Sequence, residues 1–442
     1  MKRPLTLLNI VIAMGASVPA AAQLSSTEAK MATSVEAEYE SNVALLEKLV
    51  NQNSGSLNIE GVTIVGQMMR EQLEALGFSV RWVPMTAAGR AGHLIATRKG
   101  GPSTGSGGGK KMLLIGHLDT VFEPASPFQK FSRDGDKGVG PGANDNKGGM
   151  VVMLAALRAM QKAGTLSGAN IEIVLTGDEE DPGDPLDVAR ADLIAAGKRA
   201  DVALDFEGLV VLDGVDMGSI ARRSSASWTV TAKAKGGHSS GIFSETAGDG
   251  AIYALAKIVV AFRTELPEQN LTFNVGLLTG GVEAELGVGG ITATASGKTN
   301  IIPEIAIARG DIRTLSPEQE ARVREKMQGI VARASPGATA DIVFATDGYP
   351  AMAPTDGNKV LLAKLNVVNT DLGLPQMPTL DPIRRGAGDI AFVAKDVDGL
   401  VGLGSAGLGD HAIGESVDLL SLKRQAKRAA ILMTRLSREK VK

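Results

Sequence analysis

The sequence has no cysteine and few of the residues that stack on nucleic-acid bases. Its 442 residues include four histidines and 3% aromatic residues, and its net charge is −3. Disulfides and thiolate metal sites are therefore excluded, and neither the charge nor the aromatic content favours nucleic-acid binding. The remaining composition, 44% hydrophobic and 21% charged, describes a globular protein whose length favours two domains.

The first 22 residues have the pattern of a secretory signal peptide. Two positive charges at positions 2 and 3 precede an apolar stretch over residues 5–18, and three alanines end at Ala22. A membrane anchor is the alternative, but the run is shorter than the ~20 residues that a span needs. We expect cleavage after Ala22 and a periplasmic or secreted mature protein that is not bound to a membrane.

Apolar runs alternate with helical patterns outside a central block. MLLIG (112–116) is continuously apolar, which predicts a strand covered on both faces, and NIEIVLTG and ADVALD predict further strands. GGMVVMLAALRAMQKAG and PLDVARADLIAAGK each predict one helix between strands. The alternation predicts an α/β fold with a mainly parallel sheet flanked by helices. We interpret the basic run KRQAKRAAILMTRLSREKVK as the solvated face of a terminal helix.

The block from residue 222 to residue 347 has a different pattern. SASWTVTAKAKGG alternates in polarity like a strand with one exposed face, and the helical AGDGAIYALAKIVVAFRTEL follows it. Two more strands, a helix opened by Ser-Pro-Glu and a last strand complete the block. We expect a small α+β domain inserted into the α/β domain.

Histidine and acidic residues follow several of the predicted strands. Because the carboxyl ends of parallel strands share one edge of a sheet, these side chains are expected to meet there. Each has an ordinary structural alternative, such as a buried histidine, a helix N-cap or a solvated turn. The candidates are His117 and Asp119 after MLLIG, Asp145 in NDNKGG, Glu179 and Glu180 in DEED, Glu207 after ADVALDF, and His411 in GLGDHAIGES.

Imidazole and carboxylate ligands without thiolates suit Zn²⁺, with Co²⁺ or Mn²⁺ as alternatives. Two such cations a few ångströms apart can share one carboxylate. A further carboxylate that is not a ligand can accept a proton from water and pass it to a leaving amine. The pattern therefore favours metal-assisted hydrolysis.

Five motifs in order, GHLDTV, GPGANDNKGG, DEE, FEG and the late His411, resemble the di-zinc metallopeptidase family of glutamate carboxypeptidase, aminoacylase and succinyl-diaminopimelate desuccinylase. The resemblance extends over essentially the whole mature chain and looks strongest to glutamate carboxypeptidase. It implies a zinc-exopeptidase-type catalytic domain over 23–221 and 348–442. It also implies that 222–347 is a lid and dimerisation domain, so that the protein is a homodimer.

The resemblance also implies roles for particular residues. His117, Asp145 and Glu207 correspond to the ligands of one zinc ion. Asp145, Glu180 and His411 correspond to the ligands of the other, with Asp145 bridging. Glu179 corresponds to the general base and acid, and Asp119 to the carboxylate that orients His117.

Inside the inserted block, His238 in GGHSSG corresponds to a lid histidine that stabilises the oxyanion, often in the partner subunit's site. Asn300 and Arg313, in TNIIPEIAIARGDIR, correspond to substrate-binding residues, and an arginine fork suits a terminal carboxylate. Two segments depart from the family pattern, Gly386–Asp389 and Asp410–Glu415, and both bear on specificity.

The resemblance implies hydrolysis of an amide bond that releases a C-terminal amino acid with a free carboxylate, from a small peptide or an N-acyl amino acid. An N-acyl amino acid deacylase and a dipeptidase are alternatives on the same site. A non-catalytic binding protein is an alternative of another class, but such a protein is expected to lose ligands or the base. Nucleotide binding is disfavoured, because GLGSAG has no helix after it and SGKT lacks the first glycine of its motif.

Overall fold

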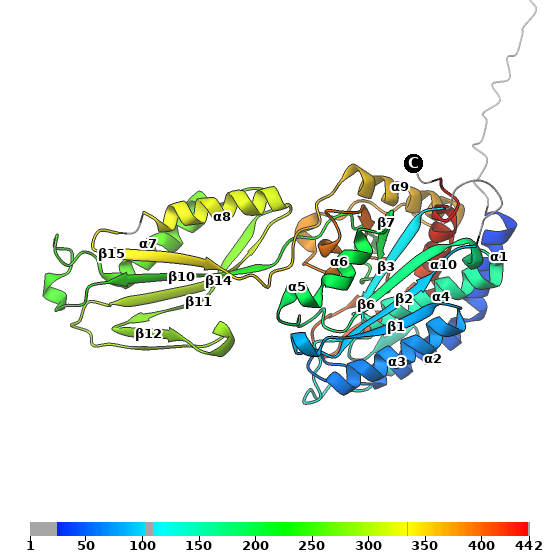
Figure 1. Ribbon diagram of the computed structural model, residues 1–442, viewed down its shortest axis with the longest axis horizontal. Helices are drawn as coiled ribbons and strands as arrows, with labels where there is room; N and C mark the ends of the chain where they lie inside the picture. The colour runs from blue at the N-terminus through cyan, green and yellow to red at the C-terminus, as the bar shows by residue number, and fades with distance from the viewer. Residues whose placement is uncertain (1–23, 102–108, 334, 441–442) are drawn as a thin grey trace, which may run out of the picture.

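The computed structural model describes residues 24–101, 109–333 and 335–440. The predicted signal peptide lies outside these residues. The described chain forms a larger α/β part and a smaller α+β part that extends from it (Figure 1). None of the helices in these ranges is both long and apolar enough to cross a membrane.

The larger part is built on a six-stranded sheet with the order β1-β2-β6-β3-β7-β16. β3, β6, β7 and β16 run parallel, whereas at one edge β2 pairs antiparallel with β6 and β1 pairs antiparallel with β2. This arrangement confirms the predicted α/β fold with a mainly parallel sheet. The strands are β1 (Ser79–Pro84), β2 (Gly92–Arg98), β3 (Lys111–His117), β6 (Asn170–Thr176), β7 (Val202–Asp205) and β16 (Gly399–Leu400).

Helices cover both faces of this sheet. Met112 and Leu114 of β3 face one apolar cluster, and Leu113 and Ile115 face another on the opposite side. This two-sided burial explains why the strand is continuously apolar. The helices of this part are α1 (Ser26–Ala37), α2 (Tyr39–Asn51), α3 (Ile59–Ala75), α4 (Lys147–Ala163), α5 (Leu186–Ala189), α6 (Ala191–Gly197), α9 (Asp356–Asp371) and α10 (Leu419–Leu436).

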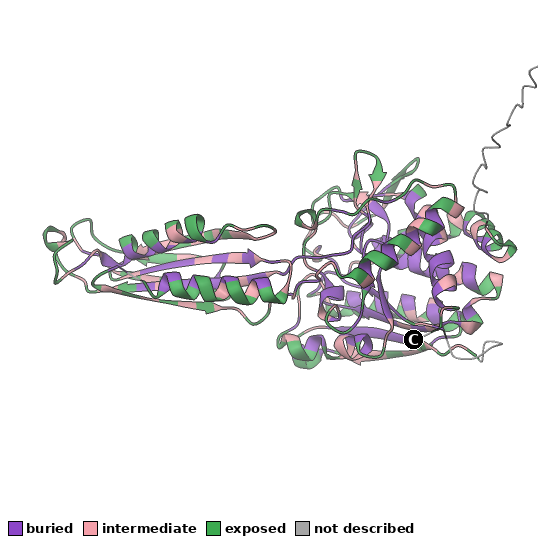
Figure 2. Cartoon of the chain, turned by 90° about the horizontal axis from the view of Figure 1, so that it is seen from above, coloured by how far each residue is buried: buried purple, intermediate pink, exposed green. Residues whose placement is uncertain are grey.

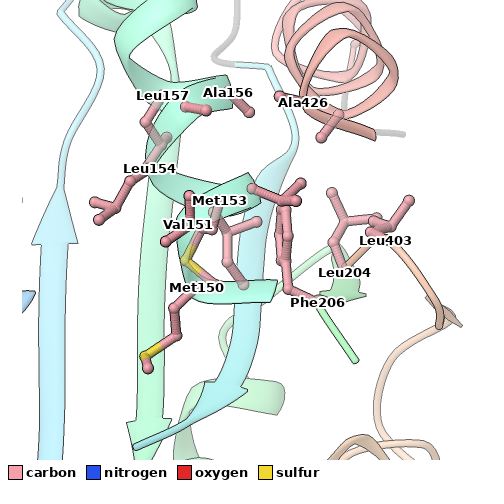
Figure 3. Close-up of a cluster of buried hydrophobic side chains, with 14 of the residues drawn as sticks. Met150, Val151, Met153, Leu154, Ala156, Leu157, Leu204, Phe206, Leu403 and Ala426 are labelled. Carbon is pink, nitrogen blue, oxygen red and sulfur yellow. The ribbon is translucent and has the colours of Figure 1, made fainter. Parts of the chain in front are cut away.

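Helix α4 lies at the centre of the larger cluster and is buried almost all round. Figure 3 shows Met150 and Met153 of α4 in one cluster of buried apolar side chains with Phe206 and with Ala426 of α10. Each fully buried Leu or Met side chain contributes about 1.5–3 kcal/mol relative to exposure. Because α4 begins directly after Asp145, this packing also fixes the position of a candidate ligand.

The smaller part, which we call the lid, has its own sheet and its own apolar core. Its antiparallel sheet has the order β11-β14-β10-β15, and the helices α7 and α8 pack on one face (Figures 1 and 2). Two segments, 222–225 and 349–352, pair with each other and join the lid to the larger part. The lid elements are β10 (Ala226–Ala234), α7 (Gly250–Glu265), β11 (Thr272–Gly281), β12 (Glu283–Leu286), β13 (Ala293–Ser296), β14 (Ile305–Arg313), α8 (Pro317–Val331) and β15 (Ala338–Phe344).

Several short elements were not predicted. β12 and β13 form a hairpin, and β8 (Val211–Leu212) pairs with β9 (Val215–Asp216). A four-stranded sheet, β17-β18-β5-β4, holds the loop that carries His411. Its strands are β4 (Ser132–Asp134), β5 (Lys137–Val139), β17 (Ala406–Leu408) and β18 (Ser416–Asp418).

Two helix predictions need correction. The single helix expected over PLDVARADLIAAGK is divided into α5 and α6 at Arg190, whose buried guanidinium donates to Asp178 and Asp389. The basic terminal helix is not only a solvated face. Its Arg428 has 1% of its side chain exposed and bonds to Asp216, because a buried guanidinium needs acceptors.

Candidate metal centre

The candidate ligands meet at the carboxyl ends of the central strands. His117 ends β3, Glu180 follows β6, and Glu207 follows β7. Asp145 lies just before α4, and His411 lies in the loop between β17 and β18. The sheet therefore brings together five residues that are far apart in the sequence.

The first group consists of His117, Asp145 and Glu207. His117 Nε2 lies 3.0 Å from Asp145 Oδ1 and 3.2 Å from Glu207 Oε1. All three ligand atoms lie within 4.8 Å of one another, so one cation can reach all of them. His117 is 1% exposed, so its imidazole is shielded from bulk water.

The second group consists of Asp145, Glu180 and His411. His411 Nε2 lies 3.2 Å from Asp145 Oδ2 and 3.1 Å from Glu180 Oε2. These atoms also lie within 4.8 Å of one another. Asp145 thus presents one oxygen to each group, as a carboxylate shared by two cations would.

Titration behaviour indicates strong electrostatic interaction within the two groups. Burial favours the neutral imidazole, but hydrogen bonds to carboxylates, the one to Asp119 first, raise the pKa of His117 well above its usual value. A hydrogen bond to Asp145 and another to Glu180 raise the pKa of His411 to about 11. Burial raises the pKa of Glu180 to about 7. Raised pKa values favour protons on these groups, and bound divalent cations would take the place of those protons.

The donor set fits two divalent cations. It consists of imidazole nitrogens and carboxylate oxygens, the ligands that Zn²⁺, Co²⁺ and Mn²⁺ accept in proteins. Among the described residues, Glu180 Oε1 is buried without a hydrogen-bond partner, so it has an acceptor position to spare.

Asp119 supports both the first group and the loop that carries Glu179 and Glu180. Its backbone carbonyl lies 3.1 Å from His117 Nδ1, and its carboxylate Oδ1 lies 3.4 Å from the same nitrogen. The backbone N–H groups of Glu179 and Glu180 donate to its two oxygens at 3.0 and 3.1 Å, and Ser56 Oγ donates at 2.6 Å. One buried carboxylate therefore orients a candidate ligand and the neighbouring candidate base.

Glu415 was missed by the sequence reasoning. Its carboxylate accepts from the backbone N–H groups of Gly142, Asn144 and Asp145 at 2.9–3.1 Å. Burial raises its pKa to about 7. Glu415 fixes the turn that aims Asp145 at both groups. The available signal was an acidic residue shortly after His411, in a loop already singled out.

Glu179 belongs to neither group of ligands and lines a cavity of about 830 Å³ beside them. Burial raises its pKa well above the usual value, and the charge of Glu207 acts in the same direction. A carboxyl group with a raised pKa can accept a proton and return it, and bound cations would lower that pKa again. The Tyr349 hydroxyl donates to the Glu179 backbone carbonyl at 2.8 Å.

Of the predicted lid residues, the structure brings only Arg313 to this cavity. His238 and Asn300 are exposed and lie beside each other in the lid, where Ser239 N donates to Asn300 O at 2.9 Å. Within one chain they therefore do not join the two groups of ligands.

The unusual segment at 386–389 has two distinct environments. Gly386 and Ala387 line the cavity, and Arg222 donates to both of their carbonyl oxygens. Asp389 is buried and accepts from Thr176 at 2.5 Å and from Arg190 at 2.8 Å.

Arg222 was also missed, although it pairs with Glu207 at 3.1 Å. Sequence spacing gives no sign of that pairing.

The fold and these two groups define an α/β protein with a candidate site for two cations at the carboxyl edge of its sheet. Residues 113–435 match the model of Peptidase family M20/M25/M40. The chain belongs to this family, and it is therefore a hydrolase of the metal-dependent peptidase and amidohydrolase type.

Two curated relatives have similar sequences over most of their length. Carboxypeptidase G2 from Pseudomonas sp. (strain RS-16) is 28% identical over 401 residues, which cover 88% of each chain. Succinyl-diaminopimelate desuccinylase from Acidiphilium cryptum (strain JF-5) is 28% identical over 413 residues, covering 90% of this chain and 98% of the relative.

Solved structures share the fold. A tripeptidase from Staphylococcus aureus matches with a TM-score of 0.67 and 18% identity, covering 91% of this chain and 99% of that one. A dinuclear metal-binding peptidase of the M20 family from Bacillus subtilis matches with a TM-score of 0.61 and 16% identity, covering 91% and 99%.

Proposed function

We propose that the protein is a zinc-dependent carboxypeptidase of the glutamate carboxypeptidase kind. It hydrolyses the amide bond that joins a C-terminal amino acid, with its free carboxylate, to an acyl or peptidyl group. The observation that carries the proposal is the carboxylate of Asp145 between two groups of ligands, with Glu179 beside them in the same cavity.

His117, Asp145 and Glu207 would hold one Zn²⁺, and Asp145, Glu180 and His411 would hold the other. When bound, the cations would supply Lewis acidity that polarises the scissile carbonyl and acidifies a water molecule. Glu179 accepts the proton of the attacking water and passes it to the leaving amine. Asp119 keeps the imidazole of His117 and the backbone of Glu179 in place for these steps.

Arg313 binds the carboxylate of the leaving amino acid. It enters the cavity from the lid, and its pairing with Asp311 uses Nε at 3.1 Å, which leaves the outer edge of the fork for a substrate. His238 and Asn300 lie away from the cavity of their own chain, so they would act in the site of the partner subunit of a homodimer. There His238 stabilises the oxyanion and Asn300 binds the substrate.

The likeness to carboxypeptidase G2 supports release of a C-terminal residue, with glutamate as the first substrate to test. The likeness to a desuccinylase supports N-acyl amino acid deacylation as the second candidate on the same site. The N-terminal pattern supports a periplasmic or secreted location for the mature protein.

A hydrolysis screen with the purified, zinc-loaded protein tests the proposal. The substrates are C-terminal dipeptides and N-acyl amino acids, each with a free and with an amidated terminal carboxylate. We expect turnover of the free acids, a loss of at least about 10-fold in kcat/KM on amidation, and abolition by a chelator. Equal turnover of both forms would contradict the carboxylate clamp. A metal-loaded protein that hydrolyses none of them would instead support a binding function.

A further inference from the structure

Three arginines line the cavity, and the proposed function uses only Arg313. Arg385 lines it together with Arg222 and Arg313. Arg313 comes from lid strand β14, whereas Arg385 lies in the larger part, in a loop between α9 and β16. A β-carbon placed on Gly386 would lie 3.8 Å from Arg313 Nη1, so Arg313 lies against the segment that carries Arg385.

Arg222 uses its donors within the protein. Its Nε donates to the carbonyl of Gly386 at 2.9 Å, its Nη2 donates to that of Ala387, and its Nη1 pairs with Glu207. These contacts fix the loop that carries Arg385. Arg222 is therefore a structural support with little left to offer a ligand.

Arg385 has few contacts of this kind. Its Nε and Nη2 are buried without a hydrogen-bond partner among the described residues, and its contact with Glu207 Oε2 is long, at 3.9 Å. A desolvated guanidinium with unpaired donors is costly, and an anion in the cavity would offset that cost.

We propose that Arg385 is a specificity-determining residue that binds a second carboxylate of the substrate. This inference rests on the proposed function, in which Arg313 binds the first. The second carboxylate has two sources, the side chain of an acidic leaving amino acid or an acidic acyl group. Both present the same planar anion to the guanidinium fork. The enzyme is therefore selective for dicarboxylate substrates.

Two matched substrate pairs test the proposal and separate the two sources. N-acetylglutamate and N-acetylglutamine differ in charge on the leaving side. N-succinylalanine and N-butyrylalanine differ on the acyl side. We expect the zinc-loaded wild type to prefer the charged member of one pair by about 10- to 100-fold in kcat/KM. The pair that shows the preference identifies the side on which the second carboxylate lies.

The variant Arg385→Ala is expected to remove that preference by lowering kcat/KM for the charged member alone. Arg385→Lys keeps a positive charge without the guanidinium fork, and it is expected to retain part of the preference for the charged substrate. Arg384→Ala is the matched control, because Arg384 is exposed and does not line the cavity. Where the preference lies on the leaving side, inhibition by glutamate relative to glutamine gives a binding measurement that follows the same order.

Two results would overturn the proposal. One is a wild-type enzyme that hydrolyses both members of both pairs equally well, a result that needs no folded variant and leaves the proposed function intact. The other is an equal loss for charged and neutral substrates in Arg385→Ala, which would mean that Arg385 only balances the charge of Glu207. Hydrolysis of no member of either pair would overturn the proposed function as well.

Discussion

At the scale of single residues, the site depends on carboxylates that each hold two partners. Asp145 lies between His117 and His411, and Asp119 holds both His117 and the backbone of Glu179. Because both carboxylates are buried, removing either one leaves several groups without a partner. Glu179 is different, since it belongs to neither group of ligands and its loss would remove a proton acceptor without removing a ligand.

We therefore expect Glu179→Gln to lower kcat by about 10²–10⁴-fold while two cations per chain remain bound. Metal content by mass spectrometry, measured beside the kinetics, checks both halves of this prediction. Glu74→Gln is the control, because Glu74 is half exposed, pairs with Arg70 and does not line the cavity. Wild-type turnover in Glu179→Gln would exclude Glu179 as the base.

Four of the five candidate ligands could be found in the sequence because each follows a recognisable strand or precedes a helix, whereas His411 lies in a glycine-rich loop. His117 after MLLIG is the simplest case. Glu415, Arg222 and Arg385 could not be assigned in this way. Their partners lie 15 or more residues away, and which partner each one meets depends on the packing of loops that have no periodic pattern.

At the scale of elements, the paired segments 222–225 and 349–352 join the lid to the larger part, and we call them the hinge. One of them contacts the candidate base. Tyr349 lies in one hinge segment and pairs with Ser225 in the other. Its hydroxyl donates to the backbone carbonyl of Glu179 and accepts from buried Arg190 at 2.6 Å. The Tyr349 side chain therefore connects the hinge to the backbone of Glu179.

Tyr349→Phe removes this hydroxyl and keeps the ring. We expect kcat to fall about 10-fold with metal content unchanged, because a small displacement of a catalytic group is costly. Arg190 retains its bonds to Asp178, so the fold should persist, and circular dichroism checks this. Tyr253→Phe on the exposed face of α7 is the control. An unaltered kcat would show that the hinge does not position Glu179.

The terminal helix α10 is held by a half-buried ion pair between Arg428 and Asp216. Burial disfavours the charge of Asp216, but a hydrogen bond from Arg428 lowers its pKa below the ordinary 3.8. A lowered folded-state pKa means that the stabilisation is present above about pH 4 and is lost as the pH falls through the folded value.

We expect Asp216→Asn to lower the free energy of unfolding by about 2 kcal/mol at pH 7. The difference from wild type should shrink as the pH falls below about 4, where the carboxylate is protonated in the unfolded state, and vanish below the lowered folded-state pKa. Denaturant titrations at pH 7 and below pH 4 measure this difference in the free energy of unfolding. Glu40→Gln, in the exposed pair with Arg133, is the control. A difference that stays constant with pH would exclude the ion pair as its cause.

The elements themselves show where sequence patterns stop being informative. The long strands and helices follow their apolar periodicity, as the continuous burial of β3 and α4 illustrates. The break between α5 and α6 at Arg190 does not follow such a periodicity. The buried hydrogen bonds of Arg190 to Asp178 and Asp389 compete there with a sequence of good helix formers. The strands β4, β5, β17 and β18 are only three residues each, which is too short for a periodic signal.

At the scale of the whole molecule, the three predicted site residues of the lid lie in two different places. Arg313 lines the cavity of its own chain, whereas His238 and Asn300 are exposed on the lid. A homodimer in which each lid reaches the partner's site would complete both cavities. The sequence could indicate these three residues only through the family resemblance, since none of them follows a strand of the central sheet.

Mixing two inactive variants tests this arrangement. His238→Ala and Glu179→Gln are each expected to lose most activity. Subunit exchange in an equal mixture forms hybrid dimers with one intact site, which restores about one quarter of wild-type activity. The mixture assayed without exchange is the control. A size-tagged subunit verifies that exchange has occurred. An exchanged mixture that recovers no activity would exclude a role of His238 in the partner's site.

The central claim is that Asp145 is shared by two cations at one edge of the sheet. Calorimetric titration of the metal-free protein with Zn²⁺, with bound metal counted by mass spectrometry, tests it most directly. The two groups of ligands predict two cations per chain in the wild type, one in His411→Ala, and loss of both in Asp145→Ala. A wild-type chain that binds no stoichiometric cation, or an Asp145→Ala variant that still binds two, would contradict it.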